Sequence, residues 1–261
     1  PLAAAAISGV GNALFHVGGG VDVLDDSEGK ASSLGVFVSP GAAGLFLGTM
    51  LGKGGASLWI VNAAMALAAF SILLTAKKTD CLVSHNAPVS FKGMGKFDVL
   101  LPAVCLFFVV IIRSFAGMTM GFAWKGEGYW GVAALAAVVL GKTAGGFAMD
   151  RIGGRPAALL SLTAAGVLFW FADSPYAGVA GIFLFNMSMP MTLCALARRM
   201  PGCKGFSFGL LTFALFLGFL PVGLGAISSS PNWLLASLCA LSALLMLPGL
   251  DGRSVSLSHE S

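Results

Sequence analysis

The chain has 261 residues, of which 57% are hydrophobic and only 10% are charged, whereas a soluble domain has about 45 to 50% and about 25%. This composition excludes an ordinary soluble domain and indicates a membrane protein. The formal net charge of +4 is distributed over loops, so we expect no nucleic-acid-binding face. The five cysteines are odd in number and lack CxxC spacing, so we expect neither a zinc site nor a disulfide framework, and no cofactor.

Nine apolar runs are close to the length of about 20 residues that a helix needs to cross a bilayer. They lack the alternation of barrel strands, and an open sheet could not satisfy its backbone in lipid. The expected fold is therefore all-α, a polytopic membrane bundle of nine transmembrane helices. The first run has no basic region before it, so we predict a span and not a signal peptide. In chain order the predicted spans are 2–21, 34–52, 55–76, 99–123, 128–149, 156–172, 175–197, 205–227 and 232–250.

The polar segment 77–98 is the one interruption long enough to be a linker. It divides the chain into a partial N-terminal bundle of three helices (1–76) and a C-terminal bundle of six helices with a short cytoplasmic tail (99–261). Because transporters are commonly built from matched halves, and because the chain begins with Pro1, we expect three further N-terminal helices to be missing from it.

The distribution of Lys and Arg predicts the orientation. If the linker is cytoplasmic, only Lys53 and Lys125 lie on the opposite side. The positive-inside rule then places the N-terminus of this chain outside and its C-terminus inside, and we expect an integral protein of a bacterial cytoplasmic membrane. The basic residues assigned to the cytoplasmic side are Lys30, Lys77, Lys78, Lys92, Lys96, Lys142, Arg151, Arg155, Arg198, Arg199, Lys204 and Arg253.

The segment "GFAMDRIGGR" (146–155) joins two predicted spans, and we expect a short turn across 141–155. Glycine permits close helix approach and a positive φ at a bend. A carboxylate at a helix end can accept hydrogen bonds from the backbone amides of an adjacent helix start and can pair with Arg. The segment resembles the signature loop of the major facilitator superfamily, with Gly154 in place of a usual basic residue; an ordinary basic loop is the alternative. The matching positions are Gly146, Asp150, Arg151, Gly153 and Arg155.

The resemblance implies that the nine spans correspond to helices four to twelve of a twelve-helix transporter. The segment "SPGAAGLFLG" (39–48) looks like the bent fifth-helix motif of exporters in this superfamily, although a kinked packing helix fits equally well. The strings "GNALFH" (11–16) and "IIRSFAG" (111–117) resemble the fosmidomycin-resistance branch of these exporters.

Two strings match enzyme motifs but do not have the secondary structure that those motifs require. The string "AAVVLGKT" (136–143) fits a loose phosphate-binding loop, but such a loop needs free backbone amides after a strand, and these residues are predicted to be helical. Similarly, "GFSFG" (205–209) fits a nucleophile elbow around Ser207 but opens a predicted membrane helix. We therefore do not expect an enzyme.

Ionisable residues inside spans are costly and are candidates for function. His16 and Arg113 lie within apolar runs, on predicted spans that the resemblance assigns to the transport cavity, and Asn12 shares a helix face with His16. Arg113 has Ser114 beside it and lies about 21 Å into its span. The alternatives are structural: His16 bonded to a neighbouring helix, and Arg113 paired with a carbonyl or a buried acid.

The segment "FNMSMPM" (185–191) predicts a polar kink in the seventh span. Asn186 and Ser188, followed by Pro190, could present free carbonyls to a solute, although a simple kink is an equal alternative.

These features predict a secondary active transporter that moves a small solute, expected to be anionic, by alternating access. The expected partners are the lipid bilayer, a small-molecule solute and a coupling ion such as H⁺, for which His16 could carry the proton. The alternative is a truncated, non-transporting membrane remnant or a partner subunit.

Overall fold

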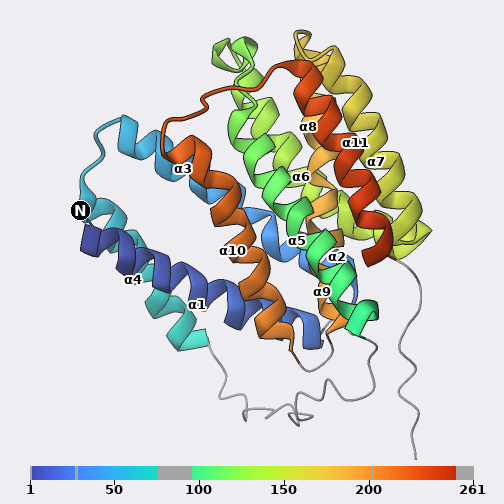
Figure 1. The fold of residues 1–261 in the computed structure, drawn as a ribbon. Helices are drawn as coiled ribbons and strands as arrows, with labels where there is room; N and C mark the ends of the chain where they lie inside the picture. Colours follow the sequence, from blue (N-terminus) through green and yellow to red (C-terminus); the bar gives the residue numbers. More distant parts are fainter. Residues whose placement is uncertain (1, 27–28, 76–95, 201–202, 251–261) are drawn as a thin grey trace, which may run out of the picture.

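The computed structural model describes residues 2–26, 29–75, 96–200 and 203–250 (Figure 1). Within these ranges all regular structure is helical, so the predicted all-α fold is confirmed. The elements are α1 (Leu2–Asp26), α2 (Ala31–Val38), α3 (Pro40–Lys53), α4 (Leu58–Thr75), α5 (Lys96–Thr119), the 3₁₀ helix η1 (Ala123–Gly126), α6 (Trp130–Ile152), α7 (Gly154–Trp170), α8 (Pro175–Asn186), α9 (Ser188–Arg199), α10 (Lys204–Gly223) and α11 (Asn232–Gly249).

Each predicted span is occupied by helix, and two of them are broken. The second span forms α2 and α3, with a break at Ser39 before Pro40, and the seventh forms α8 and α9, with a break at Met187. Six helical stretches in the described part of the chain are long and apolar enough to cross a membrane. They are Ala31–Lys53, Val99–Thr119, Trp130–Ile152, Pro175–Arg199, Lys204–Gly223 and Asn232–Gly249. By the same criteria α7, with 17 residues, and the apolar stretches of α1 and α4 are shorter.

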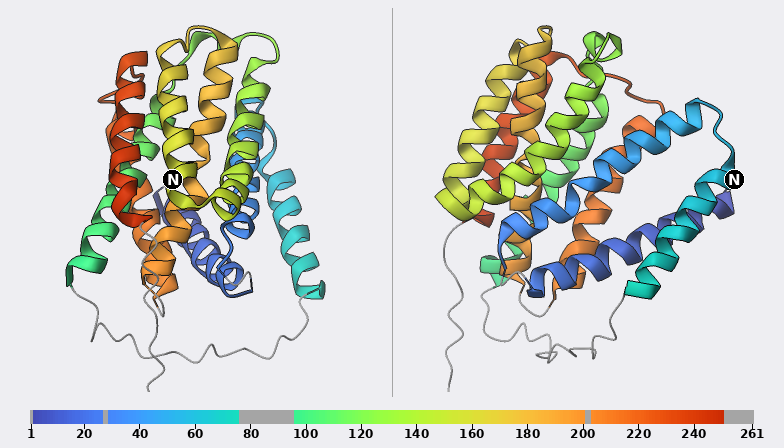
Figure 2. Two further views of the ribbon diagram at one scale, coloured as in Figure 1. Left: turned by 90° about the vertical axis from the view of Figure 1, so that its right-hand side faces the viewer. Right: turned by 180° about the vertical axis from the view of Figure 1, so that it is seen from behind.

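Helices α5 to α11 form a bundle in which α5 packs on α10 and α11, α7 packs on α8 and α11, and α6 packs on α8 (Figure 1). The N-terminal helices lie to one side of this bundle (Figure 2). Of these, α1 packs on α10, and α2 packs on α6 and α9. Helix α4 is exposed along most of its length, with Trp59 82% exposed and Leu73 76% exposed.

Glycines of α6 let three helices approach one another closely. A Cβ atom added to Gly145 would lie 2.1 Å from the Met187 carbonyl oxygen, at the break between α8 and α9. One added to Gly146 would lie 2.3 Å from the carbonyl oxygen of Ala31, at the start of α2. Neither position has room for a larger side chain, so these contacts fix where α6 lies against its neighbours.

The turn predicted over 141–155 is wrong in length. Helix α6 continues to Ile152 and α7 begins at Gly154, so the bend consists of Gly153, with φ of 88°. Because Gly141 and its neighbours pack against other helices, tertiary contacts outweigh the low helix propensity of glycine here. Lys142 is therefore a residue of the helix interior and does not belong to a loop. Residues 136–143 and 205–209, which carry the two enzyme-like patterns, are also helical.

Candidate functional site

A cavity of about 580 Å³ lies among η1 and helices α3, α5, α6, α8, α9 and α10. Apart from its apolar and glycine residues, its lining consists of Arg113, Ser114, Lys125, Lys142 and Asn186. No Asp or Glu among the described residues lines it. The cavity is therefore an apolar space with three basic groups and two neutral polar groups.

Arg113 lies on α5 and is 8% exposed. Helices α10 and α11 hold α5 in place, and the rise of about 1.5 Å per residue puts Arg113 about 21 Å from Val99. Its Nη1 atom is buried and has no hydrogen-bond partner in the described part of the protein. A guanidinium carries five N–H donors in a planar fork that fits a carboxylate or a phosphate. At least one donor of this side chain therefore has no acceptor among the described residues.

Lys142 reaches the cavity from α6, about 18 Å along that helix from Trp130. It lines the same cavity as Arg113, so the two positive charges repel each other there. Its role in the lining was missed from the sequence because it was assigned to a cytoplasmic loop. The available signal was its spacing: Lys142 precedes Asp150 by eight residues, or about two helical turns, so a signature loop that starts at Asp150 leaves Lys142 inside the membrane helix.

Lys125 lies in η1, at the end of the cavity between α5 and α6. Its Nζ donates a hydrogen bond to the carbonyl oxygen of Met120 at 2.6 Å and lies 5.0 Å from the ring centroid of Phe122. Burial lowers the pKa of Lys125 to about 8, because desolvation disfavours the charged form. The sequence interpretation used this lysine only as a marker of topology, whereas the structure makes it part of the cavity.

The predicted kink at 185–191 is present. Asn186 ends α8 and lines the cavity, and its Nδ2 donates to the carbonyl oxygen of Ile182 at 2.8 Å. One further N–H and the Oδ1 atom of Asn186 are not engaged in that bond. Ser188 is buried and does not line the cavity; its Oγ donates to the carbonyl oxygen of Phe185 at 2.8 Å. Ser188 therefore helps to shape the break.

Of the other residues predicted to line the cavity, Ser114 does so and His16 does not. Ser114 lines the cavity, although its Oγ donates to the carbonyl oxygen of Leu215 on α10 at 2.6 Å. His16 does not line it; this half-buried residue of α1 lies edge-on to Phe15, with ring centroids 5.7 Å apart. The side chain of Asn12 lies outside the residues whose side chains the structure describes.

The segment 146–155 lies apart from the cavity residues described above, where the end of α6 meets the start of α2. The carboxylate of Asp150 accepts hydrogen bonds from the backbone amides of Ala31 at 3.0 Å and Ser32 at 2.8 Å. These amides open α2, whose N-terminus has no other side-chain cap, and a carboxylate there also interacts favourably with the helix dipole. The positive charge that acts on Asp150 comes from Arg198.

Arg198 also ties the end of α9 to the turn before α2, because its Nη2 donates to the carbonyl oxygen of Gly29 at 3.0 Å. Asp150 on α6 therefore contacts the start of α2, and Arg198 on α9 contacts the turn just before α2. Arg151 and Arg155 flank the Gly153 bend and are exposed.

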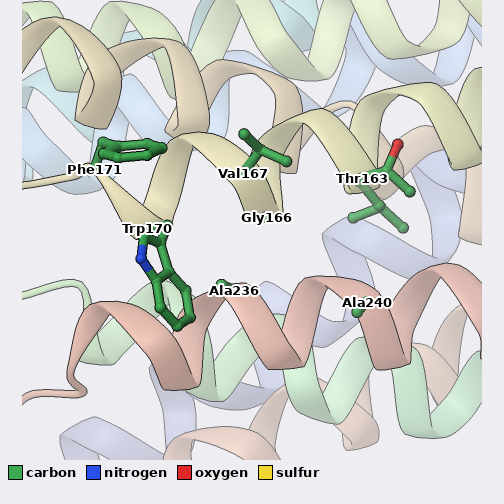
Figure 3. A pocket seen from close by; sticks show the side chains of 8 residues that line it. Thr163, Gly166, Val167, Trp170, Phe171, Ala236 and Ala240 are labelled. Atoms are coloured by element: carbon green, nitrogen blue, oxygen red, sulfur yellow. The ribbon is translucent and has the colours of Figure 1, made fainter.

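A second hollow of about 380 Å³ lies between α7 and α11 (Figure 3). Gly166, Ala236 and Ala240 leave the space open, and Trp170 and Phe171 lie toward one end of it. Among the described residues, the only polar side-chain oxygen in its lining belongs to Thr163, which donates to the carbonyl of Leu159. None of the described lining residues is ionisable, so they provide no counter-charge for a charged solute.

Comparisons of the chain with protein families, with characterised proteins and with solved structures found no match in any of the three. The family resemblance of residues 146–155 therefore stays a prediction. The geometry that bears on function is the basic cavity and the Asp150 contact with α2.

Proposed function

We propose that the protein is a secondary active transporter of the major facilitator type, which moves a small anionic solute across the membrane by alternating access. In this proposal the nine helical spans are helices four to twelve of that fold, with the cavity near the middle of the membrane. Six membrane-length helices and a cavity between them support it, since solute sites in such transporters lie between helices at mid-membrane.

The observation that carries the proposal is Arg113, which lines the cavity together with Lys142 and whose buried Nη1 atom has no hydrogen-bond partner in the described part of the protein. A charged group buried without a partner is strongly unfavourable. An anionic solute in the cavity would supply a counter-charge to Arg113 and would gain charge-assisted hydrogen bonds. A cationic solute would instead meet three like charges.

The contact between Asp150 and α2 supports alternating access. It joins the last turn of α6, in the C-terminal bundle, to the first turn of α2, in the N-terminal bundle. When two bundles rock against each other, contacts of this kind must break and form again. Asp150 would then help to set the balance between inward-facing and outward-facing states.

The proposed orientation keeps the Asp150 contact on the cytoplasmic side of a bacterial cytoplasmic membrane. With Lys142 reassigned to the membrane, eleven of the twelve basic residues originally assigned to the cytoplasmic side stay there. The opposite side still has Lys53 and Lys125, so the positive-inside bias persists.

A partner subunit is the second candidate function, and the isolation of α4 bears on it. Helix α4 packs closely on no other helix in the described part of the protein, and its apolar side chains are exposed, as expected if lipid or another polypeptide covers them. A lone chain that binds anions and transports them in vesicles would contradict this alternative, whereas activity only after co-expression with a second membrane protein would support it.

The proposed function is tested by titrating the purified full chain with benzoate, succinate and inorganic phosphate. We expect Arg113→Ala to abolish anion binding while membrane abundance stays unchanged, and Arg113→Lys to retain weak binding, because Lys provides the charge without the planar fork. Lys53→Ala, at the exposed end of α3, is the matched control. Normal anion affinity in Arg113→Ala would overturn the proposal, and loss of abundance in both Arg113 variants would indicate a structural partner instead.

A further inference from the structure

We infer that Arg113 and Lys142 form the two ends of a site for a dianion, with two separated negative groups on a short apolar frame. This inference rests on the proposed function and adds the substrate class: a small dicarboxylate. Arg113 would bind one carboxylate, and Lys142 would bind the other.

The first step is the placement of the two cations. Arg113 belongs to α5, which packs on α10 and α11, whereas Lys142 belongs to α6, which packs on α2 and α8. The two side chains therefore enter one cavity from helices that are held by different neighbours. A ligand that lies between α5 and α6 can therefore contact both side chains at the same time.

The second step is the charge of the ligand. A monoanion can neutralise one of the two cations, but the other then stays in an apolar space without a counter-charge, which is costly. A dianion neutralises both and also relieves the repulsion between them. The pair therefore distinguishes solutes by their number of charges as well as by their shape.

The third step is Asn186, a polar residue that lines the same cavity as Lys142. The Cβ atom of Asn186 lies 3.2 Å from the position that a Cβ on Gly141 would occupy, so Asn186 faces the same turn of α6. Its amide has one N–H beyond the bond to Ile182. That N–H can donate to a carboxylate held by Lys142.

The fourth step is the wall between the charged ends. Apart from Ser114, Lys125 and the three residues named above, the cavity is lined by glycine and apolar side chains, among them Phe46, Phe185 and Met189. This apolar part of the wall suits methylene groups. A four-carbon dicarboxylate has the required form, with charged ends and an apolar centre.

The test compares succinate with succinamate, which has nearly the same shape but carries an amide in place of one carboxylate. We expect the full wild-type chain to bind succinate at least about tenfold more tightly, since one charge-assisted interaction contributes about 1.5 kcal/mol or more. Lys142→Met should lose this preference by weakening succinate and sparing succinamate. Lys142→Arg should retain it, and Lys53→Met is the control for loss of a lysine outside the cavity.

The outcomes separate the inference from the proposed function. Equal affinity for the two probes in the wild type, or an equal loss of both in Lys142→Met, would overturn the two-ended site. Inorganic phosphate that binds more tightly than succinate and depends equally on both cations would overturn it too, in favour of a single compact anion. If Arg113→Met leaves both probes bound normally, the proposed function itself fails. Membrane abundance and gel filtration of each variant show whether it folds.

Discussion

Two of the ionisable side chains of helix α6, Asp150 and Lys142, have opposite surroundings. Asp150, near its end, accepts two backbone hydrogen bonds from the start of α2 and lies near Arg198. Lys142, two turns earlier, lies in the cavity beside another cation, and no hydrogen bond of its ammonium group is found in the described part of the chain. A charge with partners within the protein holds elements together, whereas a charge without them is suited to a ligand. The comparison predicts different responses to mutation at the two positions.

The largest effect is expected at the glycine that lets α6 meet α2. In Gly146→Ala the new Cβ would lie 2.3 Å from the Ala31 carbonyl oxygen and 2.7 Å from the Cα of Ser32. The backbone of α2 must move away, which also separates Asp150 from its amide partners. We expect the free energy of unfolding to fall by about 1 to 3 kcal/mol, measured by thermal unfolding of the purified protein in detergent.

Gly209→Ala on α10 is the matched control, because an added Cβ there meets no atom within 4 Å. Alanine is the better helix former, so this variant should be as stable as the wild type or slightly more stable. Equal destabilisation by both substitutions would show that the close contact at Gly146 has no special role.

A smaller effect is expected at the paired charge itself. Asp150→Ala leaves the amides of Ala31 and Ser32 without their acceptor and should lower the free energy of unfolding by about 1 kcal/mol, as for other helix caps. Asp150→Asn keeps one acceptor oxygen and should cost less stability. It removes the negative charge, however, so the balance between states should shift, and uptake of the most tightly bound anion should fall more than membrane abundance does.

The measurement pairs vesicle uptake with a membrane-abundance blot. The control is Asp173→Asn, since Asp173 is an exposed residue whose carboxylate accepts a hydrogen bond from Asn232 at 3.0 Å but does not contact the N-terminal helices through that bond. Parallel losses of uptake and abundance in Asp150→Asn would leave Asp150 with a structural role alone.

The difference between Asp150 and Lys142 also shows what the sequence could reveal. Gly146, Asp150 and Gly153 could be interpreted in advance because each meets a local requirement: space for a neighbouring backbone, an acceptor for free amides, and a positive φ. The all-helical fold followed likewise from apolar run length, because the bilayer leaves few alternatives. Local chemistry and the solvent were sufficient for these features.

The content of the cavity depends on tertiary packing instead. Lys142 lies within a membrane-length helix because α6 continues through its glycines, which contact α2 and the break at Met187. His16 is excluded from the lining because packing on α10 sets the rotation of α1, and no pattern within α1 encodes that rotation. Ser188 was a reasonable candidate by position, but its hydroxyl is used at the kink. Arg113 could be predicted as a functional residue because burying an arginine in an apolar span costs free energy whichever way its side chain points.

The smallest predicted effect concerns Lys125, which is intermediate between the two cases: its ammonium has a carbonyl partner, Met120, and still lines the cavity. Burial lowers its pKa to about 8, so it is mostly charged at pH 7 and mostly neutral at pH 9, while carboxylates stay ionised throughout. Raising the pH across this window therefore removes one positive charge, and succinate affinity should fall by about fivefold, the effect of about 1 kcal/mol of screened attraction.

Titrations at several pH values should show that Lys125→Met binds more weakly at pH 7 and has lost this part of the pH dependence. Any dependence that persists in the variant belongs to other groups, and an unchanged profile would mean that the charge of Lys125 does not act on the bound anion.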